Sequence, residues 1–165
     1  RQMCIRDRVK EALFSIIAPR LSAARVLDLY AGCGQIGIEA VSRGAAHVVM
    51  VEQAREAAAA LRGNLSIIHK SDVAEFLYMP VQKALSHLSC QGKKFDIIFA
   101  DPPYADGPKA VDLIATACTK NGLLAPGGLC IIEHDKRTAL PENVMNLTRL
   151  RCCKYGMTML TFYTE

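Results

Sequence analysis

The turn Asp101-Pro102-Pro103-Tyr104 carries the residues best suited to chemistry in this sequence. It follows residues 94–100, an apolar segment with the composition of a buried strand. Two prolines remove two amide donors and fix the backbone, so the turn presents carbonyl oxygens in a rigid geometry. Asp101 and the Pro102 carbonyl can both accept hydrogen bonds from an aromatic amino group, whose lone pair then becomes available to attack an electrophile. Tyr104 can stack on the ring that bears the amino group, although a purely structural strand end is the alternative interpretation.

A glycine-rich loop precedes this turn in the chain. Residues 32–37, Gly-Cys-Gly-Gln-Ile-Gly, have the G-x-G-x-x-G spacing between a predicted strand over 25–30 and a predicted helix over 36–42. Glycines let the backbone approach a ligand closely, and Glu52, at the end of the next predicted strand over 47–52, can hold ribose hydroxyls. The pattern indicates a nucleoside-containing cofactor, with a tight turn and an exposed glutamate as the alternative.

Asp28 distinguishes between two classes of such a cofactor. It lies inside the first predicted strand, just before the glycine loop, where it can receive the ammonium of an amino-acid moiety and would repel a pyrophosphate. S-adenosylmethionine carries an amino acid and a sulfonium and no phosphate, so Asp28 favours it over a dinucleotide. Asp72, expected after a third strand, can accept from the adenine amino group or can simply cap a helix.

The elements that must position these residues alternate between strand and helix. Predicted strands cover residues 25–30, 47–52, 66–70, 94–100 and 129–133. Predicted helices cover 9–17, 36–42, 55–65, 73–89 with a bend at Pro80, and 109–120, and residues 147–154 and 157–164 form a predicted hairpin. This order implies a parallel sheet with helices on both faces, in which ligands bind at the carboxyl ends of the strands. The motifs fall at those ends.

The length and the charge of the chain limit its domain number and the kind of partner it can bind. With 165 residues the chain has the size of one domain, which we expect to span residues 1–165. The net charge of +4 is concentrated in residues 1–25, which suits a polyanionic partner contacted by Arg8 and Lys10. A solvated basic helix is the alternative.

Other features exclude several classes of protein. No apolar run reaches the roughly 18 residues of a membrane span, and the start has no secretory pattern, so we expect a cytoplasmic protein that contacts no membrane. The seven cysteines lack C-x-x-C spacing, which favours reduced thiols. The four histidines are scattered, and we expect no metal site.

Together these motifs resemble the bacterial RsmD-like family, which methylates the exocyclic amino group of one guanine in 16S ribosomal RNA. The resemblance runs from about Asp7 to the end. It rests on residues 7–14, on the segment Leu27 to Gly37, on Glu52 and Asp72, and on the turn at 101–104. Cys4-Ile5-Arg6 stands where the family has Arg-Pro-Thr, so we expect residues 1–6 to be truncated or non-native.

The resemblance implies a Rossmann-like class I methyltransferase fold, with a seven-stranded, mostly parallel sheet and an antiparallel C-terminal strand. It implies S-adenosylmethionine as cofactor and RNA, as 16S ribosomal RNA or an assembling small subunit, as partner of a monomer. Residues expected to bind the cofactor are Asp28, Tyr30, Ala31, Gly32, Gly34, Gly37, Glu52, Gln53, Asp72, Val73 and Asp101, and those expected to be catalytic are Asp101, Pro102, Pro103 and Tyr104.

Four other functions stay open from the sequence. Adenine-directed enzymes share the same turn but normally carry a target-recognition region, for which no segment here is long enough. Glutamine amide methyltransferases have Asn in place of Asp101. A catalytically silent nucleotide-binding module and an NAD-linked oxidoreductase belong to different classes.

Overall fold

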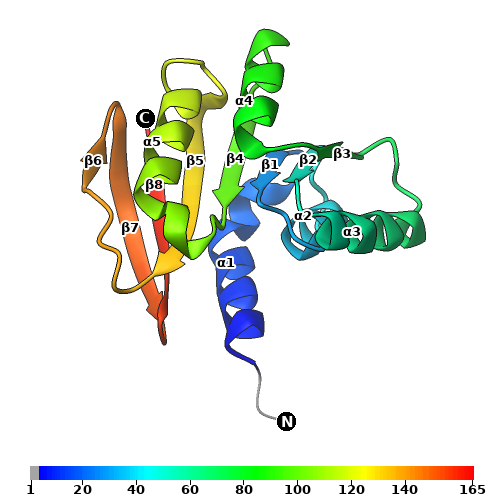
Figure 1. Cartoon of the computed structure of the whole chain (residues 1–165), viewed down its shortest axis with the longest axis horizontal. Coiled ribbons are helices and arrows are strands. Elements are labelled where there is room, and N and C mark those ends of the chain that lie inside the picture. The colour runs from blue at the N-terminus through cyan, green and yellow to red at the C-terminus, as the bar shows by residue number, and fades with distance from the viewer. Residues whose placement is uncertain (1–3) are drawn as a thin grey trace.

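The computed structural model describes residues 4–165, which form an eight-stranded sheet (Figure 1). Its strand order is β3-β2-β1-β4-β5-β8-β7-β6. The first five strands in this order are parallel to one another, and β8, β7 and β6 are paired antiparallel. The strands are β1 (Arg25–Leu29), β2 (His47–Glu52), β3 (Ala74–Tyr78), β4 (Phe95–Ala100), β5 (Leu124–Asp135), β6 (Asn143–Val144), β7 (Leu147–Tyr155) and β8 (Thr158–Thr164).

The predicted α/β architecture is confirmed, with one correction to the strand count. The sequence predicts seven strands, and the structure has eight because the two residues of β6 pair with the start of β7. The predicted C-terminal hairpin is β7 and β8, and β8 lies between β5 and β7 in the sheet.

Five helices cover the two faces of the sheet. Helices α1, α2 and α3 pack on one face, and α4 and α5 pack on the other. Because both faces are covered, the central strands are apolar along nearly their whole length rather than alternating. The helices are α1 (Ile5–Leu21), α2 (Gln35–Ser42), α3 (Arg55–Ile68), α4 (Val81–Cys90) and α5 (Gly107–Cys118), and a short 3-10 helix, η1 (Tyr104–Asp106), precedes α5.

Helix α1 is longer than predicted in both directions. It begins at Ile5 and includes Pro19, which was expected to close it, because a proline in the last turn leaves most of the helix hydrogen bonds intact. Its first turns extend beyond the carboxyl ends of β4 and β5 (Figure 1). Of residues 1–6, expected to be truncated or non-native, residues 1–3 lie outside the described part, and Ile5 and Arg6 form the first turn of α1.

The prediction for residues 66–80 is wrong. Residues 66–68 continue α3 to its end at Ile68, and His69 follows in a left-handed conformation with a φ of 49°. The third strand is residues 74–78, predicted as helix, and α4 begins only after Pro80, which caps it instead of bending it. Strand β3 pairs with β2 alone at the edge of the sheet and is only half-buried, so it lacks the apolar signal of the central strands.

Three further observations concern the described part of the chain. No helix in residues 4–165 is long and apolar enough to cross a membrane. No group of three His, Cys, Asp or Glu side chains in the same residues is arranged to hold a metal ion. The seven cysteines are free thiols.

Candidate active site

Three adjoining cavities meet at Asp101, directly after β4. The Tyr104 cavity, of about 250 Å³, is lined by the turn at 101–104 and by residues that follow β5. The Asp28 cavity, of about 230 Å³, is lined by Asp28, the glycine loop and α1. The Glu52 cavity, of about 330 Å³, is lined by Glu52, Gln53 and residues 101–103. Asp101 is the one residue of the described chain that lines all three.

Asp28 is a buried carboxylate at the floor of its cavity. Its side chain belongs to β1, is 1% exposed, and accepts a hydrogen bond of 3.0 Å from the Gly37 N–H. The pKa of Asp28 is raised to about 8, with burial as the main cause; the Gly37 N–H opposes the rise, and the charges of Asp101, Glu52 and Glu133 add to it. A positive charge in this cavity would stabilise the ionised carboxylate.

The glycine loop is held in conformations that leave room above it. Tyr30, Gly32 and Gly34 all have positive φ angles, of 59°, 60° and 89°. Such a φ is unusual for a tyrosine and marks a backbone that is constrained by its surroundings. A Cβ on Gly34 would collide with Leu61 of α3, whereas a Cβ on Gly32 would meet nothing within 4 Å. The loop therefore packs tightly on α3 on one side and is open on the other, where a ligand can approach.

Glu52 ties the loop to the end of β2. One oxygen accepts a hydrogen bond of 2.8 Å from the Gly32 N–H, and the other accepts 2.8 Å bonds from the N–H groups of Gln53 and Ala54. A carboxylate offers about four acceptor positions, so Glu52 keeps capacity for one further donor. Its position in the Glu52 cavity suits a ribose hydroxyl.

The charges of these cavities fit S-adenosylmethionine. Asp28, Glu52, Asp101 and Glu133 lie at the carboxyl ends of four neighbouring strands, in a row that favours a ligand with an ammonium and a sulfonium. Pyrophosphate would be repelled by the same carboxylates. The buried Asp28 suits the ammonium, and Glu52 suits the ribose.

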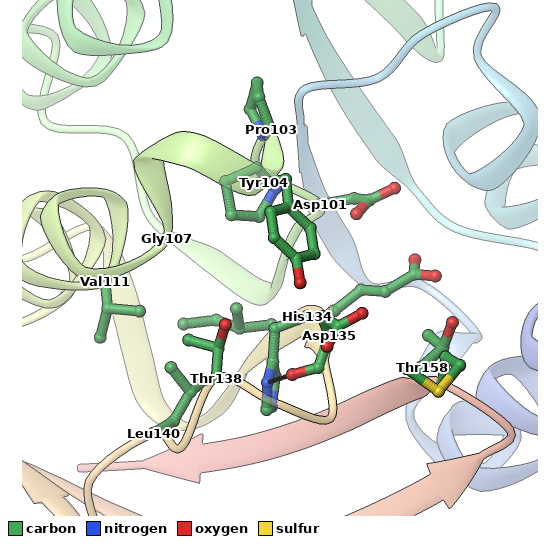
Figure 2. A pocket seen from close by; sticks show the side chains of 14 residues that line it. Asp101, Pro103, Tyr104, Gly107, Val111, His134, Asp135, Thr138, Leu140 and Thr158 are labelled. Atoms are coloured by element: carbon green, nitrogen blue, oxygen red, sulfur yellow. Dashed lines mark hydrogen bonds between the residues drawn. The ribbon is translucent and has the colours of Figure 1, made fainter.

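The Tyr104 cavity lies on the other side of Asp101. Figure 2 shows the Tyr104 ring pointing into it with the hydroxyl toward Asp135 and His134, whereas the Asp101 carboxylate points away from Tyr104. His134 Nε2 lies 2.7 Å from the Thr161 hydroxyl, and its Nδ1 lies 3.0 Å from the Asp135 carbonyl. The carbonyl can only accept, so Nδ1 carries the proton and Nε2 accepts from Thr161. Burial lowers the pKa of His134, which agrees with a neutral ring.

Among the residues of this site that were missed from the sequence are Glu133, Arg6 and Arg137. Glu133 lines both the Tyr104 and Asp28 cavities, and burial, followed by the charge of Asp101, raises its pKa to about 7. Arg6 lines the Asp28 cavity from α1. Arg137 lies 5.3 Å from the Tyr104 ring centre and forms an ion pair of 2.8 Å with Asp135. For Glu133 a signal was present, since it stands at the end of a predicted strand like Glu52.

The structure brings most predicted residues together, but Asp72 and Val73 lie at the opposite edge of the sheet. Asp72 and Val73 precede β3 and lie at the amino ends of the strands, because Val48, the second residue of β2, pairs with Ala74. They were expected after a third strand and therefore at the carboxyl edge, so that placement is wrong. The residues that do follow β3 are Met79 and Pro80, which carry no carboxylate for the adenine amino group.

The remaining predicted residues lie at or near the three cavities. Lys10 lines the Asp28 cavity and is half-buried, whereas Arg8 is exposed on α1 and lines none of the three. Gly34 packs against Leu61 of α3, and the Gly37 N–H donates to Asp28, so both glycines hold the loop in place without lining a cavity. The other predicted residues line at least one cavity: Asp28, Tyr30, Ala31, Gly32, Glu52, Gln53, Asp101, Pro102, Pro103 and Tyr104.

A family model described as conserved hypothetical protein 95 matches residues 4–164. The chain belongs to the conserved hypothetical protein 95 family. YlbH of Bacillus subtilis is 33% identical over 159 residues, which cover 96% of this chain and 85% of that protein. Ribosomal RNA small subunit methyltransferase D of Escherichia coli is 33% identical over 137 residues, which cover 82% of this chain and 65% of that protein. A solved structure of a conserved hypothetical protein from Streptococcus pyogenes is 34% identical, with a TM-score of 0.84 and 93% coverage of each chain.

Membership of the conserved hypothetical protein 95 family confirms the family that the glycine loop and the Asp101 turn predict. The Rossmann-like methyltransferase fold is confirmed as well, because solved relatives match along nearly the whole chain. The predicted cofactor, S-adenosylmethionine, agrees with this family and with the acidic cavities around Asp101.

Proposed function

We propose that this protein is an S-adenosylmethionine-dependent methyltransferase that methylates the exocyclic amino group of a guanine in small-subunit, 16S ribosomal RNA. The observation that carries the proposal is the position of Asp101, shared by the Tyr104, Asp28 and Glu52 cavities. A cofactor in two of the cavities and a base in the third would meet at this carboxylate. The name of the Escherichia coli relative, Ribosomal RNA small subunit methyltransferase D, supports small-subunit ribosomal RNA as the substrate.

On the cofactor side, each residue has a distinct task. When bound, S-adenosylmethionine supplies a methyl group made electrophilic by its sulfonium. Asp28 holds the ammonium, and its hydrogen bond with the Gly37 N–H fixes the direction of its carboxylate. Glu52 holds the ribose and fixes the glycine loop through the Gly32 N–H. The open side of Gly32 lets the ligand lie close to the backbone.

On the target side, the turn orients the amino group. Asp101 and the Pro102 carbonyl accept hydrogen bonds from its two N–H groups, which directs the nitrogen lone pair toward the methyl group. Desolvation in the cleft raises the pKa of Asp101, and the nearby Arg6 guanidinium lowers it. Tyr104 is 65% exposed at the mouth of its cavity, a position suited to stacking on a base.

The lining of the Tyr104 cavity favours guanine over adenine. Its charged lining residues are Asp101, Glu133 and Asp135; Asp135 is paired with the nearby Arg137, whereas Asp101 and Glu133 receive no hydrogen bond from the residues described. The Watson–Crick edge of guanine presents two adjacent donors, the N1–H and the amino group, whereas adenine presents an acceptor beside its amino group. The free carboxylates of Asp101 and Glu133 match the two donors of the guanine edge.

The experiment supplies labelled S-adenosylmethionine together with 16S ribosomal RNA or small subunits from cells that lack the endogenous enzyme. The expected result is label on the exocyclic amino group of one guanine, mapped by nuclease digestion and mass spectrometry. Small subunits from cells that possess the enzyme should take up little label, because the site is already methylated. Label on adenine, or on DNA alone, would contradict the proposal.

A variant pair connects this activity to Asp101. Asp101→Ala should fold and keep most of its cofactor affinity, because Asp28 and Glu52 hold the ammonium and the ribose, yet its transfer rate should fall about a hundredfold or more, as when one preorganised electrostatic contact is lost. Asp101→Asn keeps one acceptor and should be slow but faster than Asp101→Ala. Asp112→Ala, on the exposed side of α5, is the matched control and should keep the parental rate. Parental activity in Asp101→Ala would make the turn purely structural.

A further inference from the structure

Within residues 4–165, Glu133 occupies a position that it shares with Asp101 alone. Of the described residues, Glu133 and Asp101 alone line both the Tyr104 cavity, on the target side, and the Asp28 cavity, on the cofactor side. They come from adjacent strands in matching register, since Ala100 of β4 pairs with Ile132 of β5 and each acid is the next residue. Both carboxylates therefore stand where a methyl group would pass from cofactor to base.

The hydrogen bonds of the site divide its carboxylates into two kinds. Asp28 and Glu52 accept bonds from backbone N–H groups, which hold them in place. Within residues 4–165, no protein group donates a hydrogen bond to the side chain of Asp101 or Glu133. Their oxygens are free to accept protons from a ligand.

The neighbours of Glu133 give its carboxylate an unusual affinity for protons. Burial is the main cause that raises its pKa to about 7, and Asp101 on β4 adds to the rise, whereas Arg6 on α1 opposes it. Asp28 on β1 also faces it across the shared cavity, because the charge of Glu133 contributes to the raised pKa of Asp28. Lys10 lines the same cavity from α1. A group with a pKa near the working pH is effective as a general base.

The neighbouring imidazole is not available for this task. His134 accepts from the Thr161 hydroxyl through Nε2 and donates from Nδ1 to the Asp135 carbonyl, so both ring nitrogens are engaged. Thr161 itself is buried. Asp135 is paired with the Arg137 guanidinium, which lowers the pKa of its carboxyl. Glu133 is the base that remains next to Asp101.

We propose that Glu133 accepts the proton that the target amino group releases when it is methylated, while Asp101 and the Pro102 carbonyl orient that group. The nitrogen lone pair forms the bond to the methyl carbon, and the carbon–sulfur bond breaks with its electron pair left on a neutral sulfur. The nitrogen then carries a positive charge and is tetrahedral, so its bond to the ring can rotate and one N–H leaves Asp101 for the adjacent Glu133. The Glu133 carboxylate takes that proton and passes it to water. This inference rests on the proposed function, because it needs an amino group as the methyl acceptor.

The test is a single-turnover measurement of methyl transfer at saturating cofactor and RNA, from about pH 5.5 to 9. The parental rate should rise with pH as Glu133 loses its proton and then level off, with a midpoint lowered from the ligand-free value by the positive charge of the bound cofactor. Glu133→Gln retains the shape of the side chain but cannot take a proton, so its rate should fall about a hundredfold or more and lose the rising arm. Glu133→Asp should be slowed but should retain a pH-dependent arm. Glu142→Gln, on an exposed loop, is the matched control.

Each outcome decides one of the two proposals. If Glu133→Gln transfers at the parental rate, or is slow with the parental pH profile, Glu133 is not the proton acceptor, while guanine methylation by the parental protein stands. If the parental protein methylates no guanine in the RNA or the small subunit, the proposed function fails and this inference fails with it. If Glu133→Gln does not fold, Glu133→Asp decides. A transfer rate equal to the parental rate, with the same midpoint in its pH dependence, would overturn the inference.

Discussion

Asp28→Asn should make the ligand-free protein more stable at neutral and alkaline pH. The pKa of Asp28 is about 8 in the folded protein, where burial is the main cause, against an ordinary value of 3.8. Between these two values the folded state holds a proton that the unfolded state has lost. The free energy of unfolding therefore falls as the pH rises through this window, by about 1.4 kcal/mol per pH unit. Asparagine has no such titration and can still accept from the Gly37 N–H through its amide oxygen.

The magnitude follows from the width of that window. From pH 5 to pH 8 the stability of Asp28→Asn relative to the parental protein should rise by about 3–4 kcal/mol. Urea unfolding of both ligand-free proteins at pH 5, 6.5 and 8 measures this difference, and other groups that titrate cancel in the comparison. Asp112→Asn, an exposed change on α5, should show a constant difference over the same range. A constant difference for Asp28→Asn as well would refute the assignment of a proton to this carboxyl.

The same variant should lose cofactor affinity. An ammonium held by Asp28 loses a charged hydrogen bond in Asp28→Asn, which costs about 1.5–3 kcal/mol of binding free energy. Calorimetry with S-adenosylhomocysteine, which carries the same amino acid, measures the loss. A misfolded variant would lose both affinity and stability, so higher stability with weaker binding separates the two explanations. Unchanged affinity would remove Asp28 from the ammonium site.

Three further predictions address the other contacts of the site. Glu52→Ala should weaken S-adenosylhomocysteine binding by about 1–3 kcal/mol in calorimetry, whereas Glu56→Ala, on the exposed face of α3, should leave it unchanged. NAD should not compete for the site, and tight NAD binding would overturn the assignment of the cofactor. Charge reversal at Arg8 and Lys10 should reduce the salt dependence of RNA binding, measured without cofactor. If the RNA affinity of the parental protein does not change with salt concentration, the basic residues of this helix contact only solvent. Tyr104→Ala should cost about 1–3 kcal/mol of RNA binding through lost stacking, and no change would leave Tyr104 outside the base contact.

The central strands and the acids that follow them could be predicted because their signals are local. The strand over residues 47–52 matches the structure at both ends, and the turn after residue 100 was found from its prolines. A strand buried on both faces shows as an uninterrupted apolar run, whichever neighbours it has. Once such a strand is located in the sequence, the acid at or directly after its last residue must lie at the carboxyl edge of the sheet.

The third strand could not be found in this way. Residues 74–78, Ala-Glu-Phe-Leu-Tyr, lie at the sheet edge and are half-buried to exposed, so their strand conformation comes from pairing with β2 and not from their own pattern. Nearby, residues 66–68 have the composition of a strand but continue α3, with Ile67 72% exposed. This single error moved Asp72 to the wrong edge of the sheet. Arg6 and Arg137 were missed because only the tertiary structure brings them to the cavities.

The four acids of the site divide into two that backbone N–H groups hold in place and two whose oxygens are free to bind a ligand. Glu52 is held by three backbone N–H groups and Asp28 by one, so these two acids keep their direction before any ligand binds. Asp101 and Glu133 receive no such bonds within the described residues, and desolvation raises the pKa of each. A bound cation would favour the ionised form of all four acids at once. Cofactor binding before the base arrives should therefore ionise Asp101, which then accepts the hydrogen bond of the amino group, and Glu133, which then accepts its proton.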